Sequence, residues 1–585
     1  MTDHSELPAV QQPVRPLPID LDRFANAMLG QMTFGLSPVS LAQAYTDWMV
    51  HLASSPAKQL ELAQRAFSQT HRLALQMLEF KSEPGIPCIE PLPQDNRFRH
   101  PSWRQPPFSF IYQSFLLTQQ WWHKGTSTVR GVSRHHRDMV TFTARQLLDM
   151  ASPSNFLLTN PEVLEETWRQ GGSNLVRGAR NWWEDWAGMA SGGRRDDHAP
   201  FQVGRDVAVS PGRVVYRNHL IELIQYAPTT AEVHAEPVLI VSSWIMKYYV
   251  LDLSPGNSLV KYLVGHGHTV FMISWRNPDE HDRNLGMEDY LQSGPLAALE
   301  AVAGIVPEHQ IHGVGYCLGG TLMSIAAAAL ARDKVDRLAT LTLLAAETDF
   351  EEPGELGLFI DESQLTYLEN IMWEQGYLDG KQMAGTFQLL RSRDLVWSRM
   401  VHEYLMGQPQ PMSDLQAWNA DTTRLPYRMH SEYLRRLYLN NQLAHGQYCA
   451  AGKPVALTNI RVPMFVVATI GDHVSPWHSM FKIHLLTDTD VTFVLTTGGH
   501  NVGIVNPPSQ GLGGYQIMER KAGDNYLDSD AWQQSAPRFD GSWWPAWEDW
   551  LARQSTMSVP ARVPPLDDTT LPALPAAPGG YVFQT

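Results

Sequence analysis

The run Gly315-Tyr316-Cys317-Leu318-Gly319-Gly320 constrains the fold of this 585-residue chain more than any other segment. An apolar stretch ends just before it, at Val314, and an alanine-rich helical pattern begins near Thr321. A Gly-x-Cys-x-Gly pattern between a strand and a helix predicts a nucleophile elbow, a sharp turn above a parallel sheet. The glycines are needed because the strand and helix backbones pass too close for a Cβ atom. We therefore predict that Cys317 is a catalytic nucleophile.

The helix after the elbow is expected to assist this nucleophile. The backbone N–H of Leu318 lies in its first turn, where it has no helical acceptor, and is predicted to bind an oxyanion. The helix dipole favours a thiolate at Cys317. A second N–H donor is expected from the loop after the apolar run 238–242, near Ile245.

Two further residues complete a triad in the chain order nucleophile, acid, base. Asp472 and His500 each follow a short apolar run, so each is expected just past the carboxyl end of a strand. We predict that His500 is the general base of Cys317 and that Asp472 orients it. His473 is a rival base because it adjoins Asp472, but adjacent side chains usually diverge, and we expect His473 to line the pocket.

Six short apolar runs separated by helical patterns predict an α/β domain with a mostly parallel sheet over residues 202–585. They comprise residues 238–242, 268–274, 311–315, 339–346, 462–469 and 491–496. Valine-rich alternation around Ser210-Pro211-Gly212 predicts a β-hairpin before them. The elbow makes the predicted class an α/β-hydrolase fold. Residues 347–456, rich in aromatics, are expected to form a mainly helical cap inserted over the carboxyl edge of the sheet.

The flanking parts of the chain differ in character. Residues 1–20 are proline-rich and expected to be mobile, whereas residues 21–201 carry apolar residues at helical spacing and predict a helical domain. Proline-rich sequence over 556–585 predicts an extended or disordered surface tail. No apolar run approaches the roughly 20 residues that a spanning helix needs, and no export signal is visible, so we expect a cytoplasmic protein without a transmembrane segment.

Composition narrows the function. A formal net charge of -15 argues against nucleic-acid binding, which usually requires a basic face. Three cysteines make a poor disulfide framework and fit a reducing compartment. Cys88 and Cys449 lack flanking glycines and are interpreted as structural. We expect neither a metal ion nor a bound cofactor.

Several segments resemble the polyhydroxyalkanoate synthases, or poly(3-hydroxyalkanoate) polymerases, over nearly the whole chain. Besides the Gly-x-Cys-x-Gly-Gly box, they include SSWIMKYYVLDL from Ser242, SLVKYLVGHGHTVFMISWRNPD from Ser258, GDHVSPW from Gly471 and GGHNVGIVNPP from Gly498. The resemblance implies a catalytic set at Cys317, Asp472 and His500, in agreement with the spacing. It also implies polymerisation of (R)-3-hydroxyacyl-coenzyme A, with release of coenzyme A, through an acyl-cysteine.

The resemblance has further implications. It places Arg391 and His473 near the coenzyme A passage, although Arg393 stands where relatives commonly have asparagine. It implies a homodimer that works at the surface of the polyester granule, and the long single chain resembles synthases that prefer short monomers. Two alternatives stay open on the same residues: a cysteine thioesterase or polyester depolymerase that uses water as acceptor, and a non-catalytic granule protein.

Overall fold

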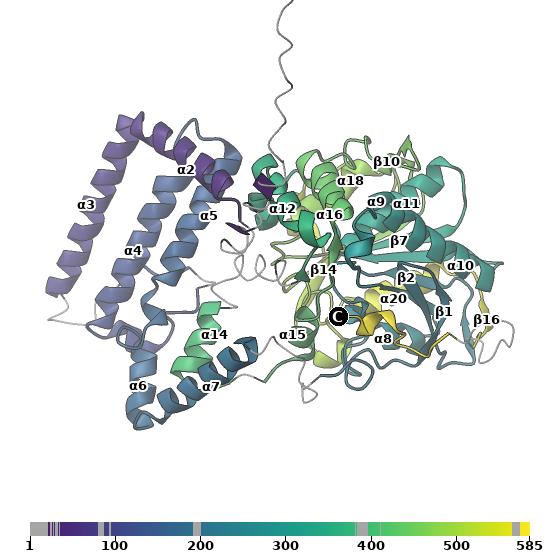
Figure 1. The fold of residues 1–585 in the computed structure, drawn as a ribbon, viewed down its shortest axis with the longest axis horizontal. Coiled ribbons are helices and arrows are strands. Elements are labelled where there is room, and N and C mark those ends of the chain that lie inside the picture. The colour runs from purple at the N-terminus through teal and green to yellow at the C-terminus, as the bar shows by residue number, and fades with distance from the viewer. Residues whose placement is uncertain are drawn as a thin grey trace, which may run out of the picture.

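The structure is a computed structural model. It describes residues 36–79, 87–92, 95–190, 201–380, 396–409, 411–563 and 574–585, with Gln382 and a few isolated positions between 22 and 33. The predicted mobile segment 1–20 and Arg391 lie outside the described residues. Figure 1 shows a group of long helices beside a larger α/β body.

The helical group precedes the sheet in the chain, and six of its helices are α2 (Pro38–Ala53), α3 (Pro56–Glu79), α4 (Phe108–Ser127), α5 (Arg134–Met150), α6 (Pro161–Arg169) and α7 (Ser173–Ala190). One apolar cluster gathers Trp48 of α2 with Met139 and Val140 of α5. A second surrounds Trp103, which is fully buried. Burial of these apolar faces holds the helices together more than intrinsic helix propensity does.

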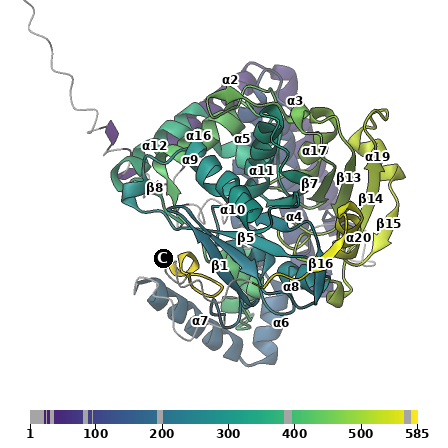
Figure 2. The same ribbon diagram turned by 90° about the vertical axis from the view of Figure 1, so that its right-hand side faces the viewer.

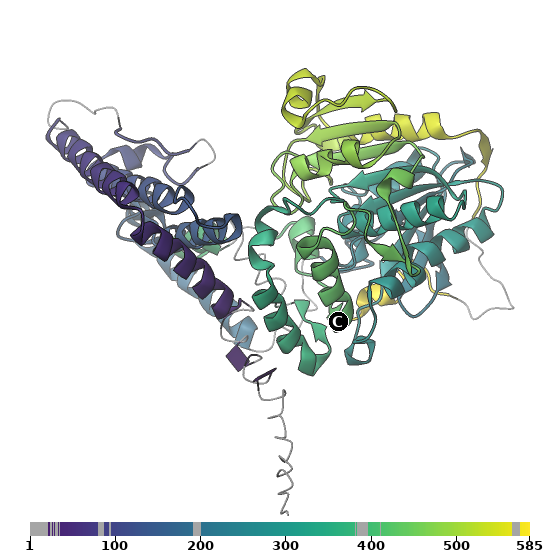
Figure 3. The same ribbon diagram turned by 90° about the horizontal axis from the view of Figure 1, so that it is seen from above.

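The helical group meets the α/β body on the side of the inserted segment, as Figure 3 shows. Next to α2, the Ser37 N–H donates to Gln364 Oε1 at 2.7 Å. From α7, the Asn181 side-chain amide donates to the carbonyl oxygen of Glu403 at 3.0 Å. The helical residues and the insertion are therefore bonded to one another directly.

A ten-stranded sheet forms the core of the α/β body, in the order β1-β2-β5-β4-β6-β7-β12-β13-β14-β15. The strands β4 (Val238–Val241), β5 (Val270–Trp275), β6 (Ile311–Tyr316), β7 (Leu338–Leu344), β12 (Met464–Thr469) and β13 (Val491–Thr496) pair in parallel. Nearly all their residues are buried, which explains why they read as continuous apolar runs. These are the six runs predicted from the sequence, and the α/β-hydrolase fold is confirmed.

The two edges of the sheet are antiparallel. They consist of β1 (Gly212–Arg217) and β2 (Ile221–Tyr226) on one side, and of β14 (Gly514–Arg520) and β15 (Arg538–Asp540) on the other. The predicted hairpin exists, but its placement around residues 210–212 is wrong, because the chain turns at 218–220. There Asn218 Oδ1 accepts the N–H groups of Leu220 and Ile221 at 2.8 and 2.9 Å, so the side chain closes the turn.

Helices cover both faces of the sheet. In Figures 1 and 2, α9 (Met287–Leu291), α10 (Ala297–Ile305) and α11 (Leu318–Arg332) lie on one side, and α8 (Leu259–Gly265) and α20 (Trp544–Gln554) on the other. Shorter helices α17 (Trp477–Phe481), α18 (Ile483–Leu486) and α19 (Ser529–Ser535) accompany the later strands. Within the described ranges, no helix is both long and apolar enough to cross a membrane.

The chain between β7 and β12 contains helices and very short strands. The helices are α12 (Glu362–Gln375), α14 (Ser398–Met400), α15 (Asp414–Asn419) and α16 (Tyr427–Tyr433); the strands are β8 (Tyr377–Leu378), β9 (Leu425–Pro426), β10 (Cys449–Ala450) and β11 (Lys453–Pro454). It includes residues 347–456, for which an inserted cap is predicted.

The C-terminal tail, predicted to be extended or disordered at the surface, is attached to the α/β body at two places among its described residues. β16 (Ser558–Pro560) pairs antiparallel with β3 (Glu232–His234). After a stretch outside the described residues, the chain returns to the sheet, where the N–H groups of Gly580 and Tyr581 donate to Glu222 at 2.8 and 2.9 Å. The Glu222 carboxylate is buried and needs these donors, which is why the last residues are held.

Candidate active site

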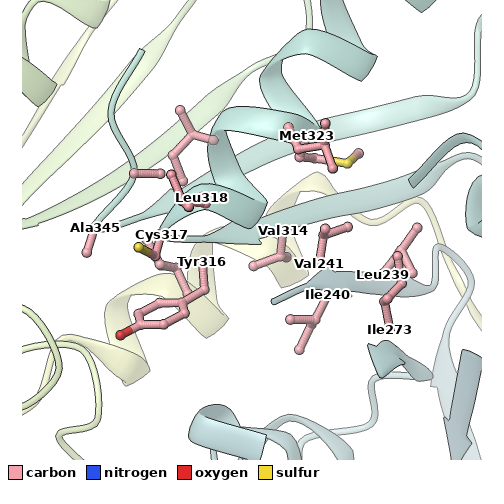
Figure 4. Close-up of a cluster of buried hydrophobic side chains, with 14 of the residues drawn as sticks. Leu239, Ile240, Val241, Ile273, Val314, Tyr316, Cys317, Leu318, Met323 and Ala345 are labelled. Atoms are coloured by element: carbon pink, nitrogen blue, oxygen red, sulfur yellow. The ribbon is translucent and has the colours of Figure 1, made fainter. Parts of the chain in front are cut away.

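Cys317 occupies the turn between β6 and α11. Its φ of 53° and ψ of -128° are unusual for a residue with a side chain. The Cys317 N–H donates to the carbonyl oxygen of Leu344 in β7 at 2.9 Å, and its own carbonyl oxygen accepts the Gly320 N–H at 2.9 Å. Figure 4 shows its sulfur at the tip of the turn, beside Tyr316. This strained, hydrogen-bonded turn is the geometry of a nucleophile elbow.

The elbow glycines allow three backbones to approach. A Cβ atom on Gly315 would collide with the Cα atom of Gly320 across the turn. A Cβ atom on Gly319 would collide with the carbonyl oxygen of Val241, at the end of β4. Glycine is therefore required for close packing at these positions, and α11 can begin directly above the sheet.

Asp472 and His500 meet where β12 and β13 end. His500 Nδ1 lies 2.7 Å from Asp472 Oδ2, and the Asp472 side chain is fully buried. The other carboxylate oxygen, Oδ1, accepts the N–H groups of Val474 and Ser475 at 2.9 and 2.8 Å. Asp472 is thus fixed from both sides and holds the His500 ring, whose second nitrogen is left for the thiol of Cys317.

The electrostatics of this cluster favour a charged imidazole. Burial lowers the pKa of His500, but negative charge at Asp472 and Cys317, together with the hydrogen bonds that the imidazole donates to both, raises it well above its usual value. Burial also opposes ionisation of Asp472, yet His500 and the two backbone N–H groups lower the pKa of that carboxyl. A protonated His500 imidazole beside an ionised Asp472 carboxylate is consequently the charge distribution that these shifts favour.

An apolar cavity adjoins the elbow. It encloses about 790 Å³ of empty space, part of it continuous with solvent, and it is lined by Leu36, Ile245, Leu318, Leu356, Phe359, Ile360, Gln364, Leu368, Ile371, Leu378, Gln382, His430, Tyr433, Leu434 and Tyr438. Most of these residues belong to the insertion. The two residues predicted as oxyanion donors, Leu318 and Ile245, both border this cavity, and Leu318 is the first residue of α11.

The remaining predicted residues stand apart from this arrangement. His473 is half-buried, and its carbonyl oxygen accepts the Glu355 N–H at 3.2 Å. The carboxylate of Asp472 accepts its hydrogen bond from the ring of His500 rather than from His473. The prediction that His473 lines the pocket and contacts coenzyme A stays a prediction. Arg391, the other predicted contact, falls outside the described residues. Cys88 is half-buried and Cys449 is exposed.

Sequence reasoning missed Glu347, three residues beyond the end of β7. Its side chain is 3% exposed, and Oε1 has no hydrogen-bond partner among the residues described. Burial, followed by the charges of Asp472 and Cys317, raises the pKa of this carboxyl well above its usual value. The signal was available, because Glu347 follows a central strand just as Asp472 and His500 do.

Comparisons with known proteins find matches over most of the chain. Family models described as "Poly-beta-hydroxybutyrate polymerase (PhaC) N-terminus", "Poly-beta-hydroxybutyrate polymerase N terminal" and "alpha/beta hydrolase fold" match residues 94–263, 17–58 and 236–507. A poly(3-hydroxyalkanoate) polymerase of Methylorubrum extorquens is 42% identical over 502 residues, or 85% of this chain and 82% of that protein.

A second relative is poly(3-hydroxyalkanoate) polymerase subunit PhaC of Cupriavidus necator, 35% identical over 92% of this chain and 90% of that protein. Among solved structures, the monoacylglycerol lipase of Paleococcus ferrophilus covers 57% of this chain and 99% of that chain, at 10% identity and a TM-score of 0.30. The fold assignment rests instead on the observed sheet and on the family model over 236–507.

Proposed function

The chain belongs to the poly(3-hydroxyalkanoate) polymerases, acyltransferases on an α/β-hydrolase fold, and we propose that it polymerises (R)-3-hydroxyacyl-coenzyme A through an acyl group carried on Cys317. The observation that carries this mechanism is the bond between Asp472 and His500 beside an elbow cysteine. The three side chains form the constellation that activates a thiol for acyl transfer.

The first half-reaction loads the enzyme. His500 takes the thiol proton of Cys317, and the sulfur attacks the thioester carbonyl carbon. The oxyanion that forms is stabilised by the Leu318 N–H and by the backbone near Ile245. When the intermediate collapses, the bond from the carbonyl carbon to the sulfur of coenzyme A breaks. That sulfur takes the proton from His500, and an acyl-cysteine remains.

The second half-reaction extends the polymer. The hydroxyl of another monomer, or of the growing chain end, gives its proton to His500 and attacks the acyl-cysteine. An oxoester bond forms, the bond to Cys317 breaks, and the thiolate returns. Asp472 stabilises the imidazolium in both halves, as its low pKa and two backbone donors favour.

The apolar cavity supports a hydroxyl rather than water as the acceptor. Its wall is largely leucine, isoleucine and aromatic side chains, which suit an aliphatic polyester and disfavour water. As parts of the same proposal, the enzyme is cytoplasmic, acts at the granule surface as a homodimer, and uses no cofactor beyond the coenzyme A of its substrate. His473 and Arg391 are proposed to contact that coenzyme A.

Two incubations test the mechanism. With (R)-3-hydroxybutyryl-coenzyme A, we expect free coenzyme A and insoluble polyester in matching amounts. With butyryl-coenzyme A, which lacks the hydroxyl needed for elongation, mass spectrometry should find a butyryl group on Cys317. Cys317→Ala should give neither result, whereas Cys449→Ala, at an exposed cysteine, should give both.

The rival functions predict different products. Stoichiometric release of soluble 3-hydroxybutyrate without polymer would establish a hydrolase that uses water as acceptor. Full polymer yield from Cys317→Ala would contradict the acyl-cysteine mechanism and favour a non-catalytic granule protein.

A further inference from the structure

Three side chains that the reaction does not use converge at the opposite end of the sheet from Cys317. His234 ends β3, His268 lies two residues before β5, and Glu548 belongs to α20. One possible ligand atom from each lies within 4.8 Å of the others. Because β5 and β6 run parallel to their common neighbour β4, the start of β5 and the end of β6 lie at opposite ends of the sheet.

The imidazole of His268 lacks full hydrogen bonding. This residue is 1% exposed, and the structure as described gives its Nδ1 atom no partner. Its other nitrogen, Nε2, lies 3.4 Å from Glu548 Oε1, a long separation for a hydrogen bond to a carboxylate. Buried polar atoms are almost always satisfied, so an unpartnered buried nitrogen here needs an explanation.

The other two side chains lie directly against His268. The His234 ring stacks on the His268 ring at a centroid distance of 4.5 Å. The cluster therefore brings together two imidazoles and one carboxylate, the kinds of group that supply ligand atoms to a metal ion.

We propose that His234, His268 and Glu548 bind one divalent transition-metal ion, best matched by zinc. Two imidazoles and a carboxylate are a ligand set that zinc accepts, with water in the fourth position. A metal about 2.1 Å from each ligand atom requires a small inward movement, which the partly exposed Glu548 side chain can make.

The expected role of this ion is structural. Glu548 lies on α20, and β16 follows α20 and pairs with β3 so that Ser558 stands opposite His234. A shared ion would fasten this C-terminal segment to β3 and to the start of β5. Because the cluster lies at the other end of the sheet from Cys317, binding should change stability and leave catalysis unaffected.

Metal binding is tested on the full chain in a Cys317→Ala background, so that zinc held by the catalytic thiol is not counted. After dialysis against micromolar zinc, elemental analysis should find one ion per chain. Cobalt(II) in its place should give the visible absorption of a four-coordinate site. Glu548→Gln and His234→Gln should each weaken zinc binding about tenfold or more. His266→Gln, at an exposed neighbouring histidine, is the matched control and should bind as before.

Stability and activity provide independent readouts. A chelator should lower the melting temperature of the otherwise unmodified chain and leave that of Glu548→Gln unchanged. The initial polymerisation rates of the unmodified chain and of Glu548→Gln, measured at a temperature where both are folded, should agree. Far-ultraviolet circular dichroism checks that the variants are folded. Absence of bound zinc in the folded parent, or equal zinc affinity in Glu548→Gln, would overturn the proposal.

Discussion

The two ends of the central sheet each hold buried histidines, and the pKa values of His500 at one end and His312 at the other are shifted in opposite directions. At the carboxyl end, Asp472 accepts two further N–H groups, and His500 has a raised pKa. At the amino end, the contact from His268 to Glu548 is 3.4 Å, and burial, with the charge of His268 second, lowers the pKa of nearby His312 to about 4. A histidine becomes a base where a fixed carboxylate and a nucleophile face it; without them it stays neutral.

The largest effect should come from replacing the His500 imidazole by an amide, with the same replacement at His312 for comparison. His500→Gln removes the group that we propose accepts and returns the proton, so we expect kcat to fall about 10²- to 10⁴-fold. His312→Gln, at the amino end, should keep kcat nearly unchanged in the folded fraction. Coenzyme A release measures both, and comparable losses in the two variants would break the contrast between the ends.

Asp472→Asn tests, through the pH dependence of kcat/KM, whether the Asp472 carboxylate raises the pKa of His500. Without the carboxylate, burial acts on His500 with less opposition, and the pKa of His500 falls. Departing coenzyme A needs a proton from His500, so the alkaline limb of the profile of kcat/KM against pH should move to lower pH. Asp488→Asn, at an exposed carboxylate, is the control. An alkaline limb that does not move would show that Asp472 does not set the charge of His500.

Alanine substitution at a glycine of the elbow and at a glycine of an ordinary helix distinguishes the effect of close packing from that of helix propensity. Gly319→Ala drives a Cβ atom into the Val241 carbonyl and should destabilise the protein by about 1–3 kcal/mol. Gly304→Ala, in α10 with nothing within 4 Å of its Cβ position, should be neutral or stabilising by up to about 1 kcal/mol. Denaturant unfolding of both variants gives the two values, and similar values would argue against a tight elbow.

Two carboxyl groups at the carboxyl end of the sheet allow a comparison through the pH dependence of stability. Asp472 has donors on both oxygens, whereas Glu347 is buried with an unpartnered oxygen and a raised pKa. A raised folded-state pKa contributes stability at low pH that is lost as pH rises. Glu347→Gln should therefore gain stability over the parent by at most about 1.4 kcal/mol per pH unit above pH ~4.5. Urea unfolding from pH 5 to 8 measures the difference, and a pH-independent difference would show that Glu347 is not held protonated.

Local patterns predicted the elements that position the site. The buried parallel strands read as apolar runs, and Cys317 has the glycines that its turn requires. Asp472 and His500 were predictable because chain order and strand ends place them at one edge. The hairpin was misplaced because Asn218 closes the turn through its side chain, while Pro211 and Gly212 gave a stronger turn signal.

Other features depend on tertiary packing that no local pattern encodes. β14 is mostly half-buried and β15 is exposed, so their apolar periodicity is weak. The tail is held by Glu222, which lies more than 350 positions away in the chain. The cluster of His234, His268 and Glu548 joins three separate elements, and its members have no common spacing.

The insertion between β7 and β12 also imposes an order on protein synthesis. Cys317 leaves the ribosome first, the whole of 347–456 follows, and Asp472 and His500 come after it. Nascent chains grow at about 5–20 residues per second, so the 155 positions from 317 to 472 take roughly 8–30 s. During that interval the nascent chain has the proposed nucleophile without the proposed acid and base, and all residues of the insertion are made before either appears. A newly made molecule therefore has every residue of the insertion before it can bring Cys317, Asp472 and His500 together.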